Sequence, residues 1–179
     1  LAEKLDRYGI PVMGTSYNAL DLAEDRGRFS SLLRDEGIPY PKFGVVENAD
    51  QAVDLCRELG FPLLVRPSYV LGGRAMEIVH EKNQLKEFIN EAFKASEENP
   101  ILIDKFINNA MEVDVDAISD GKDVYVAGIM QHIEEAGIHS GDSACCLPPI
   151  SIKENLLREL KIQTRKLALA LKVKGFLNI

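Results

Sequence analysis

The Asp120-Gly121 pair is the feature of this sequence that most constrains the fold. An Asp-Gly dipeptide between two strand patterns favours a tight antiparallel hairpin, because glycine adopts the positive φ that such turns need. Before this pair, segment 113–117 alternates apolar and acidic residues, which is typical of a strand with one polar face. After it, a second long strand is predicted at about 123–131. The second part of the chain therefore predicts an antiparallel sheet.

Residues 42–107 show a different pattern, in which compact apolar strands alternate with amphipathic helices. Asn48 and Gln51 resemble a capping box at the start of the first helix, and Gly60 supplies its stop. This order predicts a small α+β lobe from about residue 42 to residue 107. The expected strands lie at 45–46, 61–66, 76–79 and 101–103, and the expected helices at about 48–60 and 85–93.

The remaining elements precede and follow these two patterns. The prediction places a short buried strand at 10–13, one helix from about Leu20 to Glu36, a loop at 134–149, a helix opened by a capping box at Ser151 and Glu154, and a strand beginning at Phe176. Helices and strands thus alternate along the chain, which is typical of the α+β class.

The composition excludes several function classes. Apolar residues make up 46% of the 179 residues and the net charge is −7, so we expect a soluble protein without nonspecific nucleic-acid binding. No apolar run approaches the roughly 20 residues that span a bilayer, so no membrane partner is expected. The three cysteines have no metal-finger spacing and are expected to be reduced thiols, which favours a cytoplasmic location.

The loop after Arg66 is the first candidate for chemistry. Gly72 and Gly73 allow backbone N–H groups to approach an anion closely, and Arg66 and Arg74 add positive charge on either side. Together these residues can close over a triphosphate. The spacing alone favours the alternative, a hairpin turn at the two glycines with two solvated arginines.

The second candidate is the crossing from Ile101 to Glu112. Backbone groups near Lys105 and Ile107 can bind an adenine edge, and the carboxylate of Glu112 can bind ribose hydroxyls. The alternative is an ordinary strand–turn–strand with an exposed acid.

The third candidate is the loop at 137–143. Its small polar residues and two glycines can fold around a ligand, and His139 is suited to phosphate contact or proton transfer. A polar surface loop is the alternative. Taken by itself, Arg26 is interpreted as a surface charge that its acidic neighbours stabilise.

Other polar residues predict no separate site. His80 and His132 lack partners at ligand spacing and are interpreted as structural or surface residues. Asp114 and Asp116 share a strand face, which is common on solvated strands, so no metal is assigned to them.

Three ordered segments resemble one known family. They are Val65–Glu77 (VRPSYVLGGRAME), Glu112–Ala117 (EVDVDA) and His139–Ser143 (HSGDS). In this order and at these separations, they are similar to the large subunit of the carbamoyl-phosphate synthetase family, which contains two ATP-grasp halves. The SYVLGGRAM form of the lid loop resembles the second half, which phosphorylates carbamate.

The resemblance implies a role for each matching position. Arg26 and Arg66 match nucleotide-binding arginines, and Gly72 and Gly73 fall in the lid loop. Arg66 and Arg74 would offset phosphate charge during transfer. The other implied nucleotide contacts are the hinge residues Lys105 and Ile107, the ribose-binding Glu112, and the loop residues Gly137, Ile138, His139 and Ser140.

The resemblance also implies a domain organisation. Residues 1–18 would end a preceding pre-ATP-grasp domain, 19–41 would form a connecting helix, 42–107 the lid lobe, and 108–179 the start of the larger antiparallel-sheet lobe. The family's Mg²⁺ or Mn²⁺ ligands would follow Ile179, so the chain is expected to be truncated and inactive by itself.

The implied activity is ATP-dependent ligation. In the intact enzyme, ATP and carbamate would give carbamoyl phosphate for arginine and pyrimidine biosynthesis. The implied partners are a glutamine amidotransferase small subunit and the other half of the large subunit. Two alternatives remain open: a biotin-carboxylase-like ATP-grasp ligase, and a non-catalytic nucleotide-binding module.

Overall fold

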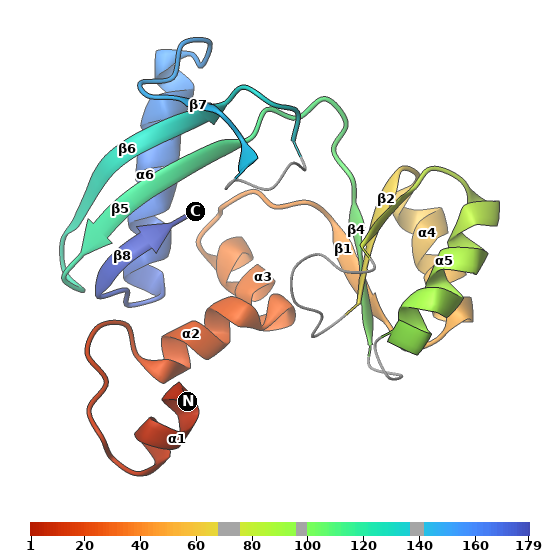
Figure 1. The fold of residues 1–179 in the computed structure, drawn as a ribbon, viewed down its shortest axis with the longest axis horizontal. Helices are drawn as coiled ribbons and strands as arrows, with labels where there is room; N and C mark the ends of the chain where they lie inside the picture. The colour runs from red at the N-terminus through yellow and green to blue at the C-terminus, as the bar shows by residue number, and fades with distance from the viewer. Residues whose placement is uncertain (68–75, 96–99, 137–141) are drawn as a thin grey trace. The chain divides into compact units, whose positions relative to one another are not determined.

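The computed structural model describes residues 1–67, 76–95, 100–136 and 142–179 (Figure 1). The chain divides into two compact units. Unit 1 consists of Leu1–Tyr40 and Asn109–Ile179, and unit 2 is the continuous segment Pro41–Asn108. Each unit contains a four-stranded sheet together with helices, so the α+β class predicted from the sequence is confirmed.

Unit 2 is an antiparallel sheet with two helices on one face. Figure 1 shows α4 and α5 beside each other against the sheet, whose strand order is β1-β4-β2-β3. All its paired neighbours are antiparallel. The elements are β1 (Phe43–Val46), α4 (Ala49–Leu59), β2 (Leu63–Pro67), β3 (Glu77–Val79), α5 (Lys82–Ala95) and β4 (Ile101–Lys105).

The ends of α4 follow directly from the local sequence. The side chain of Asn48 accepts a hydrogen bond from the Gln51 N–H at 2.9 Å, and Gln51 Oε1 accepts one from the Glu47 N–H at 2.8 Å. The predicted capping box is therefore present, with its return bond shifted by one residue. Gly60 ends the helix at φ +67, a conformation that glycine adopts without steric cost.

The core of unit 2 lies between the sheet and these helices. Its strand residues alternate, because successive side chains point to opposite faces. The buried members come from β1, β2, β3 and β4 and from the inner faces of both helices. They are Val46, Ala52, Cys56, Leu63, Val65, Val79, Leu85, Ile89, Ala92, Ile101 and Ile103.

Unit 1 contains the predicted hairpin. Its sheet has the order β7-β6-β5-β8, and α6 packs along β5 and β6 (Figure 1). The elements are α1 (Ala2–Arg7), α2 (Tyr17–Glu24), α3 (Arg26–Asp35), β5 (Val113–Ser119), β6 (Val124–His132), β7 (Cys145–Cys146), α6 (Glu154–Ala170) and β8 (Gly175–Asn178). Within the described ranges, no helix combines the length and apolar character that crossing a bilayer requires.

The turn between β5 and β6 is stabilised by its own side chains. Ser119 pairs with Val124, so residues 120–123 connect the strands. The carboxylate of Asp120 accepts hydrogen bonds from the N–H groups of Lys122 and Asp123, each at 2.8 Å. These bonds favour the ionised form and lower the pKa of Asp120. The hairpin prediction is confirmed, and its turn is longer than the dipeptide alone.

Two predictions in the N-terminal part are wrong. Residues 10–13 form no strand, and Met13 is 99% exposed; a short apolar run does not by itself supply a neighbouring strand. The single helix expected from Leu20 to Glu36 is two helices, α2 and α3. Asp25 interrupts them with an extended backbone, and its side chain accepts a hydrogen bond from the Arg28 N–H at 2.9 Å, which caps α3.

Two further differences lie around the loop at 134–149. The short strand β7 lies within that predicted loop and pairs with the end of β6. The N-cap of α6 is Lys153 and makes no side-chain cap bond, so the capping box at Ser151 and Glu154 is wrong. The hydroxyl of Ser151 instead accepts a hydrogen bond from Gln131 Nε2 at 2.8 Å. A tertiary contact has replaced the local one.

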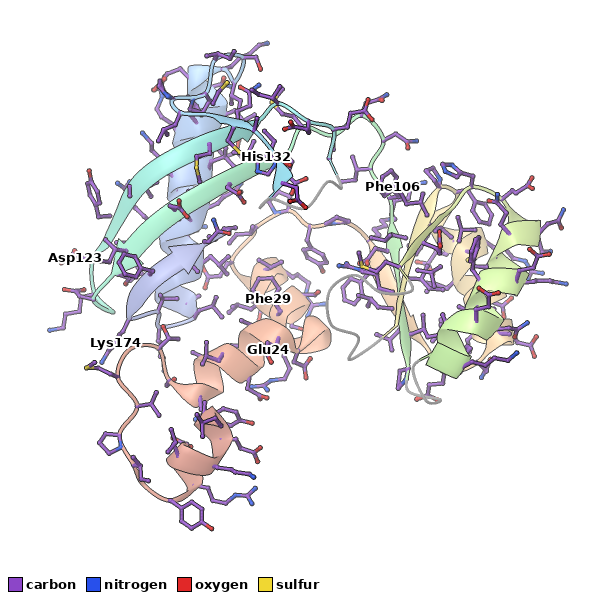
Figure 2. The ribbon with its side chains drawn as sticks, in the orientation of Figure 1. Glu24, Phe29, Phe106, Asp123, His132 and Lys174 are labelled. Carbon is purple, nitrogen blue, oxygen red and sulfur yellow. The ribbon has the colours of Figure 1, made fainter. Side chains whose placement is uncertain are left out.

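The core of unit 1 joins α3 to the end of α6. Leu33 packs with Leu167, Ala168, Leu171 and Val173, and Phe29 covers the same cluster. Figure 2 labels Phe29 on α3. This packing fixes α3 against a segment more than a hundred residues later in the chain.

The buried strand β4 yields a stability prediction. Ile103 is fully buried, so Ile103→Ala should lower the free energy of unfolding by about 2–5 kcal/mol through lost burial and a cavity. Ile78→Ala makes the same chemical change on β3 at a side chain that is 38% exposed, and should cost about 1 kcal/mol. Urea unfolding followed by circular dichroism measures both, and equal losses would contradict the assigned core.

Candidate functional site

Arg66 is held by a carboxylate on the neighbouring strand. Arg66 lies on β2 opposite Leu102, and Asp104 lies two residues further along β4 on the same face of the sheet. Arg66 Nε donates to Asp104 Oδ2 at 2.7 Å, and Arg66 Nη2 donates to the same oxygen. The side chains are only 23% and 12% exposed. The predicted nucleotide-binding arginine is therefore anchored at one edge of its guanidinium.

Asp104 was missed by the sequence interpretation. It follows the apolar residues 101–103 and is 8% exposed. A buried carboxylate needs a partner, because desolvation penalises an unpaired charge. The signal in the sequence was a single acidic residue at the end of an apolar strand, which indicates a buried charge that needs a partner. Only the pairing of β2 with β4 shows that Arg66 is its partner.

The ammonium group of Lys105 bonds within unit 2. Lys105 Nζ donates to the carbonyl oxygens of Gly60 at 3.0 Å and Phe61 at 2.7 Å. These carbonyls follow the C-terminal end of α4, where positive charge is favourable. The Lys105 N–H also donates within the unit, to the Lys42 carbonyl at 2.8 Å. The side chain of Lys105 thus fixes the end of β4 to the α4–β2 turn.

The segment after β4 joins the two units. Phe106, labelled in Figure 2, donates its N–H to the Pro62 carbonyl at 3.1 Å, and Ile107 is 55% exposed. The unit boundary falls between Asn108 and Asn109. Glu112, in unit 1, lies just before β5 and is partly buried; its carbonyl accepts the His132 N–H at 3.0 Å.

A second polar group lies on the sheet of unit 1. His132 Nε2 lies 2.9 Å from Asp114 Oδ2, and the imidazole is 1% exposed. Figure 2 labels His132 near the end of β6. Cys145, on β7, lies opposite His132 of β6, and partial desolvation and the nearby carboxylates of Asp114 and Glu134 raise its pKa. The interpretation of His132 as structural or surface is consistent with its burial and its carboxylate partner.

Several predicted site residues cannot be placed. Gly72, Gly73 and Arg74 lie outside the described residues, and so do Gly137, Ile138, His139 and Ser140. Arg26 is the first residue of α3, but its side chain is also outside the description. The roles proposed for these residues therefore stay predictions.

A metal site does not emerge from the described part of the chain. Across those residues, no three His, Cys, Asp or Glu side chains come together in a group that could hold a metal ion. The His, Cys, Asp and Glu side chains of these described residues therefore do not fit the Mg²⁺ or Mn²⁺ centre that the family resemblance implies. No catalytic step through a metal follows from these residues.

Comparison with known proteins identifies the family. The profile described as "Carbamoyl-phosphate synthase L chain, ATP binding domain" matches residues 25–179. The chain belongs to this family. It is 50% identical over its full length to the carbamoyl phosphate synthase large chain of Corynebacterium glutamicum and 53% identical to that of Archaeoglobus fulgidus. It spans only 16% and 17% of those two relatives.

Solved structures show the same fold. D-alanyl-alanine synthetase A from Vibrio cholerae matches with a TM-score of 0.80 and 16% identity, covering 99% of this chain and 56% of that one. Biotin carboxylase from Campylobacter jejuni matches with a TM-score of 0.78 and 21% identity, covering 99% and 41%. Both are ATP-grasp enzymes, so the expected ATP-grasp fold is confirmed.

The Lys105 contacts predict a stability effect. Lys105→Met keeps most of the side-chain volume but removes both ammonium–carbonyl bonds, so it should lower the free energy of unfolding by about 1–3 kcal/mol. Lys86→Met, at an exposed position of α5, is the matched control and should change it by less than about 0.5 kcal/mol. Thermal unfolding of both variants tests this, and a Lys105 variant as stable as the control would refute the structural role.

Proposed function

We propose that this chain is the ATP-binding part of the second, carbamate-phosphorylating half of a carbamoyl-phosphate synthase large chain. Its family membership supports ATP binding and ligase chemistry. The assignment to the second half is supported by 51% identity over the whole chain to a protein of Aquifex aeolicus named "Carbamoyl phosphate synthase large chain, C-terminal section". The chain spans 33% of that relative.

The anchored guanidinium of Arg66 is the observation that best supports a phosphate site. Arginine has five N–H donors, and two of them are directed to Asp104; among the described residues, 5 − 2 leaves three for a further acceptor. An arginine held at one edge offers the other edge to a phosphate with little loss of rotamer entropy. Arg74 and the amides near Gly72 and Gly73 would add to this charge in our proposal.

The segment from Lys105 to Glu112 would bind the nucleoside. The N–H groups of Lys105 and Phe106 are donated within unit 2, so we propose that Ile107 supplies the next backbone N–H to an adenine edge. Glu112 would bind the ribose hydroxyls. Arg26 and the residues Gly137, Ile138, His139 and Ser140 would complete the nucleotide contacts.

In the whole protein, we propose attack of a carbamate oxygen on the γ-phosphorus of ATP, with ADP as the leaving group. Such transfer depends on positioning and on neutralising phosphate charge more than on a covalent protein intermediate. Arg66 would orient and neutralise the phosphates. The proposal includes a cytoplasmic setting, a glutamine amidotransferase small subunit, the other half of the large chain, and supply of arginine and pyrimidine biosynthesis.

Arg66→Ala tests the phosphate contact. Loss of a charge-assisted bond should weaken ATP binding at least about tenfold, as measured by isothermal titration calorimetry. Arg57→Ala is the control, since Arg57 lies exposed on α4 and pairs with Asp54 at 2.7 Å. It should leave the affinity unchanged. Equal ATP affinity in the Arg66 variant and the wild type would contradict the site.

The chain by itself should bind ATP without making carbamoyl phosphate. The described residues do not group three potential metal ligands, and the chain spans about a sixth of its full-length relatives. The measurement is coupled detection of carbamoyl phosphate with ATP, Mg²⁺ and carbamate, with an intact large chain as positive control. Turnover near that of the intact chain would overturn this expectation.

A further inference from the structure

We infer that Asp104 is a positioning residue, which orients Arg66 for the phosphates of ATP without touching the nucleotide itself. This inference rests on the proposed function, because it assigns a role to Asp104 only through Arg66.

The geometry restrains the guanidinium in one orientation. Arg66 Nε and Arg66 Nη2 both donate to one oxygen, Asp104 Oδ2. Two bonds from adjacent nitrogens hold Oδ2 beside one edge of the guanidinium, and the attachment of the guanidinium through Cδ limits its rotation about the remaining axis; a single bond would restrain it less. The remaining N–H groups therefore point away from Asp104 in a defined direction. A free arginine would have to give up this freedom when ATP binds.

The burial of the pair protects its hydrogen bonds from competition by water. The side chains of Arg66 and Asp104 are 23% and 12% exposed, so solvent competes weakly for their bonds. The exposed pair of Arg57 and Asp54 is the contrast, with side chains 67% and 73% exposed. An exposed pair of this kind contributes little and is readily replaced by water. Only the buried pair can hold an arginine in place before the ligand arrives.

Charge alone predicts the opposite result from orientation. Asp104 is an anion beside the arginine that would bind an anionic ligand, so its charge opposes ATP binding by simple Coulomb repulsion. Asp104→Asn removes that charge, keeps an isosteric side chain and leaves Arg66 only a neutral amide oxygen, which is a weaker acceptor than the carboxylate. If charge dominated, this variant would bind ATP more tightly. If Asp104 acts by orienting Arg66, the variant should bind ATP more weakly despite its lost negative charge.

The experiment is a double-mutant cycle on ATP affinity by calorimetry at fixed salt. We expect Asp104→Asn to weaken binding about fivefold or more, and to have no further effect once Arg66→Ala is present, because the two residues act as one unit. Asp54→Asn, in the exposed pair, is the matched control and should leave the affinity unchanged. Tighter binding by Asp104→Asn, or an equal loss in both Arg66 backgrounds, would overturn the inference.

Arg66→Lys tests the same idea with Asp104 unchanged, in case the aspartate variant does not fold. Lysine retains the charge but lacks the planar fork, so its affinity should fall close to that of Arg66→Ala. Wild-type affinity in Arg66→Lys would overturn the positioning role while leaving the proposed function intact. A folded wild-type chain without ATP affinity would overturn the proposed function and this role together. ATP binding with additive losses would overturn the positioning role alone.

Discussion

The pairing of β4 with strands on both sides is the constraint on which unit 2 depends. β4 contacts β1 along one edge and β2 along the other, so its backbone bonds are satisfied in the middle of the sheet. Its side chains then alternate with a period of two. Ile101 and Ile103 enter the core under the helices, while Asp104 points to the other face. A single strand thus determines both the packing and the position of the buried carboxylate.

The same strand connects stability to the candidate site. Asp104 is buried because β4 is central, and a buried carboxylate is stable only with a partner. Arg66 donates hydrogen bonds to this carboxylate, and the same bonds restrain the Arg66 side chain. Lys105, the next residue, fixes the end of β4 to the carbonyls of Gly60 and Phe61. The segment proposed to bind the nucleoside therefore begins at the end of β4, where strand pairing and the Lys105 side chain both restrain the backbone.

Local signals account for the elements that the sequence predicted well. The Asn48 cap, the Gly60 stop and the Asp120-Gly121 turn each depend on bonds between residues close in the chain, and each is present. Two of the failures have a common cause. The run at 10–13 pairs with no strand among the described residues, and Ser151 bonds to Gln131 rather than capping α6. Both outcomes depend on segments distant in sequence, which periodicity and capping rules do not include.

The sequence by itself determined the family, the α+β class and the candidate positions Arg66, Lys105, Ile107 and Glu112, because ordered motifs and turn chemistry are local properties. Only the tertiary structure decided what those side chains do. It paired Arg66 with Asp104 and directed the Lys105 ammonium to main-chain carbonyls. Strand register and burial set these partners, and both arise when β2 and β4, far apart in the chain, come to lie side by side.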